Sequence, residues 1–187
     1  MMRRGHWSVG HVFLLVGIAA SCRPGDGAEP ITCLESVFIE NITSQRAWQE
    51  SLQDIVVSRR PEFAELASIL KHLQLAMIDM TEARFRYVIA SPERLEAQHG
   101  LSEFVDFGVV WSEADEAALL DEASDYRDLV RRTDSLRAGN NGHPDWPRLR
   151  AYSTDELMGD PEFTGALEQF QRLQREINAK LRACAEN

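Results

Sequence analysis

The sequence lacks an excess of positive charge. Its 187 residues carry 20 Lys and Arg against 30 Asp and Glu, which gives a formal net charge of -10 at pH 7. Nucleic acids and anionic lipid surfaces both favour clustered Lys and Arg, so we expect neither as a partner. Hydrophobic residues at 44% and charged residues at 27% are ordinary for a globular domain, which argues against a wholly disordered chain and a polytopic membrane protein.

The motifs of common hydrolases and nucleotide-binding enzymes are also missing. The chain has no Gly-x-Ser-x-Gly, no His-Glu-x-x-His, no Ser-x-x-Lys and no glycine-rich phosphate loop. Two of the five histidines lie within the first 21 residues, which leaves His72, His99 and His143 as candidate bases. We therefore expect a protein that is not an enzyme, with an enzyme of unrecognised arrangement as an alternative.

Patterns for a metal or a cofactor are incomplete. Glu96 and His99 form one Glu-x-x-His motif, whereas a di-iron bundle needs two of these and two further glutamates. His72 with Met77 or Met80 offers haem-ligand types, but Cys-x-x-Cys-His is absent and both methionines fall on an apolar helical stripe. The sequence predicts no metal and no cofactor.

No apolar run is long enough to span a bilayer, but a short one follows a charged start. Arg3 and Arg4 precede an apolar stretch at residues 9–20, and small residues follow it. This order is typical of an export signal, which we assign to residues 1–21.

The end of this signal has a recognisable form. The segment Ile18-Ala19-Ala20-Ser21-Cys22 resembles the lipobox of bacterial lipoproteins. The resemblance implies cleavage before Cys22, a lipid on Cys22, and attachment to the periplasmic face of a membrane in the cell envelope. Ala19 stands where the family usually has Leu, so cleavage by an ordinary signal peptidase, with secretion, stays open.

Residues 22–32 are suited to a flexible tether. Two prolines and two glycines lie between Arg23 and Pro30, and no large apolar residue is there to be buried. We therefore predict a tether at 22–32 and a single folded domain at 33–187.

The remaining cysteines predict a disulfide. If Cys22 carries lipid, Cys33 and Cys184 are left in an oxidising compartment, where they are expected to pair. Closing a loop of about 150 residues would stabilise the fold by roughly 5 kcal/mol through loss of chain entropy in the unfolded state. The alternative is a pair of buried free thiols.

Helical signals dominate the folded part. Arg60-Pro61-Glu62 predicts the start of a helix that reaches about Ala90, because proline suits the first helical position. One stripe of this helix is apolar except at Arg84. Its members are Phe63, Leu66, Leu70, Leu73, Met77, Met80, Arg84 and Tyr87.

Four further helices are predicted from caps and spacing. One runs from Ser112, its cap, to about Ala138 and is closed by Gly139, and another runs from Asp160 to about Ala183. Shorter helices are expected at 44–58 and 91–100. No stretch alternates for long enough to propose a sheet. We therefore predict an all-α, four-helix-type bundle with crossings of roughly 20°.

The segment from Gly139 to Gly159 is predicted as a long loop before the last helix. Loops between bundle helices usually have about 2–8 residues, so a longer one needs a reason. Its residue types are common in interface hot spots and make it the candidate partner-binding site. These residues are His143, Trp146, Arg148, Arg150 and Tyr152. The alternative is that Trp146 and Leu149 cover one end of the bundle and that Ser153 to Met158 adds a capped helical turn.

The sequence as a whole predicts an exported, lipid-anchored envelope protein with a non-catalytic binding or structural role. Its expected partners are the membrane, through the anchor, and an envelope protein. A helical bundle that binds a ligand or cofactor is the alternative, and a defined apolar cavity would favour it.

Overall fold

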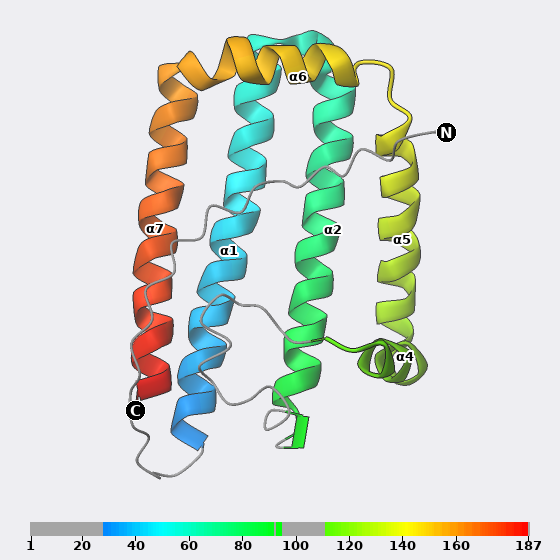
Figure 1. Ribbon diagram of the computed structural model, residues 1–187, viewed down its shortest axis with the longest axis vertical. Helices are drawn as coiled ribbons and strands as arrows, with labels where there is room; N and C mark the ends of the chain where they lie inside the picture. Colours follow the sequence, from blue (N-terminus) through cyan, green and yellow to red (C-terminus); the bar gives the residue numbers. More distant parts are fainter. Residues whose placement is uncertain (1–27, 92, 95–110, 187) are drawn as a thin grey trace, which may run out of the picture.

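A computed structural model describes residues 28–91, 93, 94 and 111–186 (Figure 1). Within these ranges all the regular structure is helical and there is no strand, which confirms the all-α bundle. The predicted signal, Cys22, the Glu96-x-x-His99 motif and most of the predicted helix at 91–100 lie outside the described residues. None of the described helices is long and apolar enough to cross a bilayer.

The first helix is much longer than the sequence suggested. α1 spans Ala28–Arg59, so the prediction of a helix at 44–58 captured only its second half. Five residues of the predicted tether, 28–32, lie in its first turns. Pro30 is tolerated there because the first N-H groups of a helix have no intrahelical acceptor. The first half of α1 is held by buried Leu34 and Phe38.

The predicted helix after Arg60 is confirmed. A short 3-10 turn, η1 (Pro61–Phe63), leads into α2 (Ala64–Ile89). The predicted stripe is wrong at Met77, whose exposed fraction is 43%. The reason is that α2 has a long neighbour on each of two sides, so its buried residues form two sets.

The predicted helix at 112–138 is two helices. α4 (Glu113–Glu122) starts with the predicted cap, in which the Ser112 hydroxyl accepts from the Asp115 N-H. Ala123 then adopts an extended conformation, with φ -121° and ψ 106°, and the chain turns into α5 (Ser124–Asn141). Figure 1 shows α4 end-on at the lower end of the upright α5. The predicted closure at Gly139 is wrong, since α5 continues to Asn141.

The predicted long loop is also wrong, because most of it is helical. α6 (Trp146–Asp155) and a 3-10 turn, η3 (Leu157–Gly159), occupy the segment before α7 (Pro161–Glu186). Pro147 lies in the first turn of α6, where its missing N-H is not needed. α7 confirms the last predicted helix.

The four long helices lie in one row, in the order α7, α1, α2 and α5 (Figure 1). α1 packs against α7 and α2, and α2 packs against α5. Among the described residues, these three pairs are the only long helices that pack extensively against each other. The row is therefore more open than a bundle in which each helix has two long neighbours, and the outer helices α5 and α7 have one each.

Contacts on α1 explain the row. Glu40 and Ser44 contact α7 through Lys180 and Gln174, at 2.6 and 3.1 Å respectively. Phe38 contacts α2 through the Phe85 ring, which it stacks on with centroids 3.7 Å apart.

At 3.6 residues per turn, Phe38 projects to a different side of α1 from Glu40 and Ser44. Arg46 follows Phe38 two turns later and reaches Asp79 of α2 at 2.7 Å. α1 is therefore held between α7 and α2.

The predicted disulfide is present. Cys33 and Cys184 are bonded, with their Cα atoms 5.6 Å apart. The bond joins the beginning of α1 to the end of α7. α6 lies across the opposite end of these two helices (Figure 1).

We expect loss of this bond to lower the free energy of unfolding by about 5 kcal/mol, because the unfolded chain is no longer closed into a large loop. Urea unfolding should compare the wild type with the double variant Cys33→Ala, Cys184→Ala. Cys22→Ala is the control, since it removes a cysteine outside the bond. Two alkylatable thiols at Cys33 and Cys184 in the native wild type would contradict the pairing.

Candidate functional site

α6 forms the end of the bundle opposite the disulfide and carries most of the predicted partner-binding residues. Leu149 and Tyr152, three positions apart on one side of α6, are each 6% exposed. They pack in one cluster with Ile55 and Val56 of α1 and Phe63 of η1. α6 therefore covers this end of the core and is held there by the apolar residues on one of its sides.

Three of the five predicted site residues hold α6 in place. The half-buried Trp146 donates its indole N-H to the Asn140 carbonyl, and the Tyr152 ring lies 5.8 Å from the Phe63 ring. His143 has only 10% of its side chain exposed, and its Nδ1 accepts from the Asp145 N-H at 3.2 Å. Burial raises the pKa of Tyr152, with the nearby carboxylates acting in the same direction.

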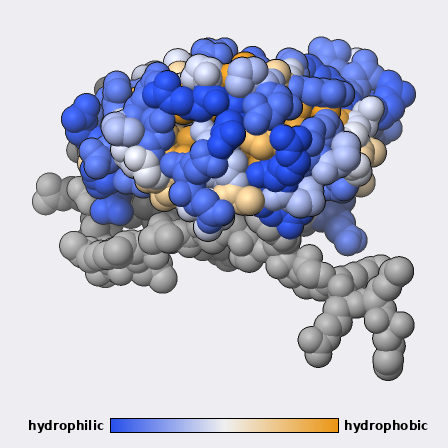
Figure 2. Space-filling view, turned by 90° about the horizontal axis from the view of Figure 1, so that it is seen from above, coloured by the Kyte–Doolittle hydropathy of each residue, from blue (hydrophilic) through white to orange (hydrophobic). Residues whose placement is uncertain are grey.

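The other two, Arg148 and Arg150, lie on the exposed side of α6. Arg148 is 60% exposed; it donates to Asp145 at 2.9 Å, and its guanidinium lies 5.4 Å from the centre of the Phe63 ring. Arg150 lies over the Trp146 ring at 5.7 Å. Figure 2 shows this end of the molecule as mainly hydrophilic, with apolar patches between polar side chains.

Ion pairs fasten the same end at its rim. Arg59, the last residue of α1, donates to Asp160 and Glu162 at the start of α7, both at 2.8 Å. Arg60 donates to Glu156 at 2.6 Å. The Arg59 hydrogen bond and the Phe163 N-H hold the pKa of Asp160 below its usual range. These pairs connect α1 to the segment that follows α6.

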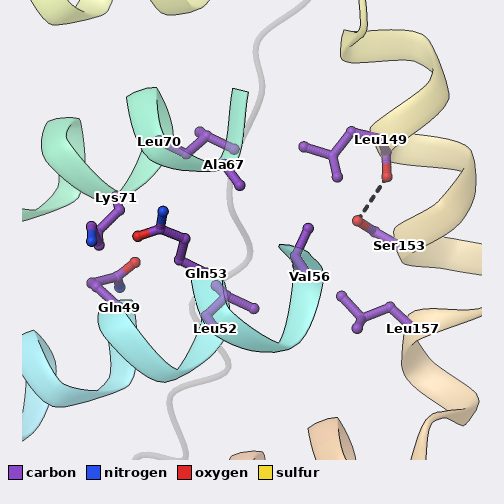
Figure 3. Close-up of a pocket in the computed structure, with 10 residues that line it drawn as sticks. All are labelled: Gln49, Leu52, Gln53, Val56, Ala67, Leu70, Lys71, Leu149, Ser153 and Leu157. Atoms are coloured by element: carbon purple, nitrogen blue, oxygen red, sulfur yellow. Dashed lines mark hydrogen bonds between the residues drawn. The ribbon is translucent and has the colours of Figure 1, made fainter. Parts of the chain in front are cut away.

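A pocket with a volume of ≈ 110 Å³ lies beneath α6, in the groove between α1 and α2. Figure 3 shows apolar side chains from all three helices and from η3 around most of it. They are Leu52, Val56, Ala67, Leu70, Leu149 and Leu157. Ser153 also lines it, but the Ser153 hydroxyl already donates to the Leu149 carbonyl at 2.8 Å.

Polar side chains gather at one end of this pocket. Gln49 and Gln53 from α1 lie beside Lys71 from α2 (Figure 3). The Gln53 Oε1 is buried and has no hydrogen-bond partner in the described part of the chain. Lys71 is half-buried and has no carboxylate within 4 Å in the same part. No sequence pattern predicts this group, because it forms only when α1 and α2 pack together.

Arg84, the one break in the predicted stripe, belongs to a second polar cluster. Its Nε donates to the Tyr126 hydroxyl at 2.8 Å, and its Nη2 donates to Glu116 at 3.0 Å. The Tyr126 hydroxyl in turn donates to Glu116 at 2.9 Å. The Trp111 indole N-H donates to the same carboxylate. The cluster therefore ties α2 to α4 and α5.

The surroundings of this cluster shift the pKa values of Glu116 and Tyr126. Partial burial acts to raise the pKa of Glu116, but the hydrogen bonds from Trp111 and Tyr126 and the charge of Arg84 outweigh it, so the pKa lies below its usual value. Burial raises the pKa of Tyr126 to about 12. Glu116 therefore stays ionised and Tyr126 neutral, as the hydrogen bonds require.

The described part of the chain contains no group of side chains typical of a metal site. Among the described residues, no three His, Cys, Asp or Glu side chains are grouped closely enough to hold a metal ion. His72 is exposed on α2 and Met77 is exposed as well.

No protein-family model, no curated protein sequence and no solved structure matches this chain.

We expect Trp146→Ala to lower the free energy of unfolding by about 2 kcal/mol, or roughly 4–8 °C in Tm, because it uncovers part of the core beneath α6. Arg148→Ala, on the exposed side of the same helix, should change it by less than about 0.5 kcal/mol. Thermal unfolding of both variants measures this. Equal Tm values for Trp146→Ala and the wild type would show that Trp146 does not stabilise the packing of α6 on the core.

Proposed function

We propose that this protein is exported, carries lipid on Cys22, and presents the α6 end of its bundle to an envelope partner. The observation that carries the proposal is the placement of two features at opposite ends of the row. The start of α1 and the Cys33–Cys184 bond lie at one end, and α6 with Arg148 and Arg150 lies at the other. Cys22 is six residues before Ala28, the first residue of α1.

The length of α1 sets the reach of such an arrangement. Its 32 residues, at 1.5 Å each, extend about 48 Å. A lipid at Cys22 would hold the disulfide end near the membrane and would leave α6 well beyond the lipid headgroups. The α6 end is then accessible to a partner in the aqueous space of the envelope.

The chemistry of both ends supports this role. A disulfide is typical of proteins in oxidising compartments, which favours export. At the α6 end, Arg148 and Arg150 are exposed and each lies over an aromatic ring, and the nearby Met158 is 57% exposed. Arginine with aromatic and methionine side chains is the composition that protein interfaces favour.

A second function, the binding of a small molecule, is favoured by the pocket beneath α6. It has apolar walls and a compact polar end, which is the usual character of a ligand site. This role is compatible with the first, because the pocket lies within the end of the bundle that is presented.

The anchor is tested by metabolic labelling with a fatty-acid probe. We expect label on the wild type and none on Cys22→Ala, while Cys33→Ala, which keeps the lipobox, should still be labelled. An unlabelled wild type, or equal label on Cys22→Ala, contradicts the lipid anchor.

The orientation is tested with the lipidated protein reconstituted in liposomes that carry a fluorescence acceptor on their headgroups. A donor dye on Arg182→Cys, near the disulfide, should transfer energy more efficiently than one on Arg150→Cys in α6. Equal transfer from both positions would mean that the row lies along the membrane and that α6 is not presented.

A further inference from the structure

We infer that the pocket between α1, α2 and α6 binds a small aliphatic carboxylate that carries a hydrogen-bond donor on the carbon next to the carboxylate. The inference rests on the second proposed function, small-molecule binding, and specifies its ligand. Size, charge and an unmatched acceptor in the pocket each restrict the ligand.

The size and lining of the pocket define the apolar part of the ligand. Its volume of ≈ 110 Å³ is somewhat smaller than an apolar cavity of about 150 Å³ that holds benzene. A branched alkyl group of about four carbons matches this space. Val56, Leu149 and Leu157 lie at the end of the pocket away from Lys71, where such a group would be surrounded by apolar side chains (Figure 3).

Lys71 defines the charge of the ligand. Five Arg and Lys side chains are half-buried in the described residues, and four of them have a carboxylate within 4 Å. These four are Arg46, Arg60, Arg84 and Arg94. Lys71 is the fifth and has none within the described part of the chain. A partly buried cation without a counter-charge attracts an anion more strongly than a fully exposed one, so a ligand carboxylate would be favoured beside it.

Gln53 defines the remaining polar group. Gln53 lines the pocket, and its Oε1 is buried and has no donor among the described residues, although buried acceptors in proteins are nearly always hydrogen-bonded. A carboxylate alone cannot donate to this oxygen, whereas a hydroxyl or amide N-H on the adjacent carbon can. Gln53 and Lys71 lie side by side at the polar end, so one ligand head group can meet both (Figure 3).

The scarcity of lysine makes a direct experiment possible. Lys71 and Lys180 are the only two lysines in the sequence. Reductive methylation with ¹³C-formaldehyde keeps their charge and gives each one an NMR signal, which Lys180→Met assigns. The full chain is then titrated with 2-hydroxy-4-methylpentanoate. We expect the Lys71 signal to shift in a saturable way and the Lys180 signal to stay in place.

Matched ligands and variants separate the contributions. Relative to 2-hydroxy-4-methylpentanoate, we expect 4-methylpentanoate, which lacks the hydrogen-bond donor, to bind about tenfold more weakly. We expect 2-hydroxy-4-methylpentanamide, which lacks the charge, to bind more weakly by about tenfold or more. By calorimetry, Lys71→Met should weaken binding of the hydroxy acid by at least about tenfold, and Lys180→Met should leave it unchanged. Circular dichroism and Tm confirm that each variant folds, and the NMR titration of the unsubstituted chain needs no variant.

Two results overturn the inference in different ways. If the carboxylate and the amide bind equally, and Lys71→Met binds both unchanged, the pocket takes alkyl compounds but the assigned ligand class is wrong. If neither lysine signal shifts and no compound binds at millimolar concentration, the pocket is not a site for these ligands and small-molecule binding fails with it.

Discussion

α1 packs against α7 through Glu40 and Ser44 and against α2 through Phe38 and Arg46. These contacts lie on different sides of one helix, and they decide how the rest of the chain is arranged. With α1 held between two neighbours, α7 becomes an outer helix and α2 must carry α5 on its far side. The result is a row of four helices, which the Cys33–Cys184 bond closes at one end and α6 covers at the other.

The row explains the location of the two polar clusters. α2 has neighbours on two sides, so Arg84 can face α5 and meet Tyr126 and Glu116 while Phe85 faces α1. The groove between α1 and α2 deepens into a pocket where α6 crosses it. Gln53 and Lys71 meet there because the row places their two helices next to each other.

Much of this fold could be predicted from the sequence, and the failures have physical causes. α2 and α7 were predicted because proline and glutamate mark their starts and a regular apolar stripe follows. The first half of α1 was missed because it is rich in β-branched residues such as Val37, Ile39 and Ile42, which lower helix propensity, and because it follows a segment with prolines and glycines. The turn at Ala123 was missed because no glycine or proline lies there. It is stabilised instead by the packing of Leu119 and Tyr126 on Tyr87, which a sequence pattern does not reveal. α6 was predicted as a loop because of its flanking Gly, Asn and Pro residues, although Leu149 and Tyr152 bury it on the core.

The row is tested most directly by an electron spin resonance distance between α5 and α7. Spin labels at Arg132→Cys and Arg175→Cys, both exposed positions, are introduced into a Cys22→Ala chain that keeps the disulfide. Three helix spacings of about 8–10 Å predict a separation of roughly 25–30 Å between the two helix axes, to which the label arms add. A closed four-helix arrangement would bring α5 next to α7, and a main distance below about 20 Å would contradict the row.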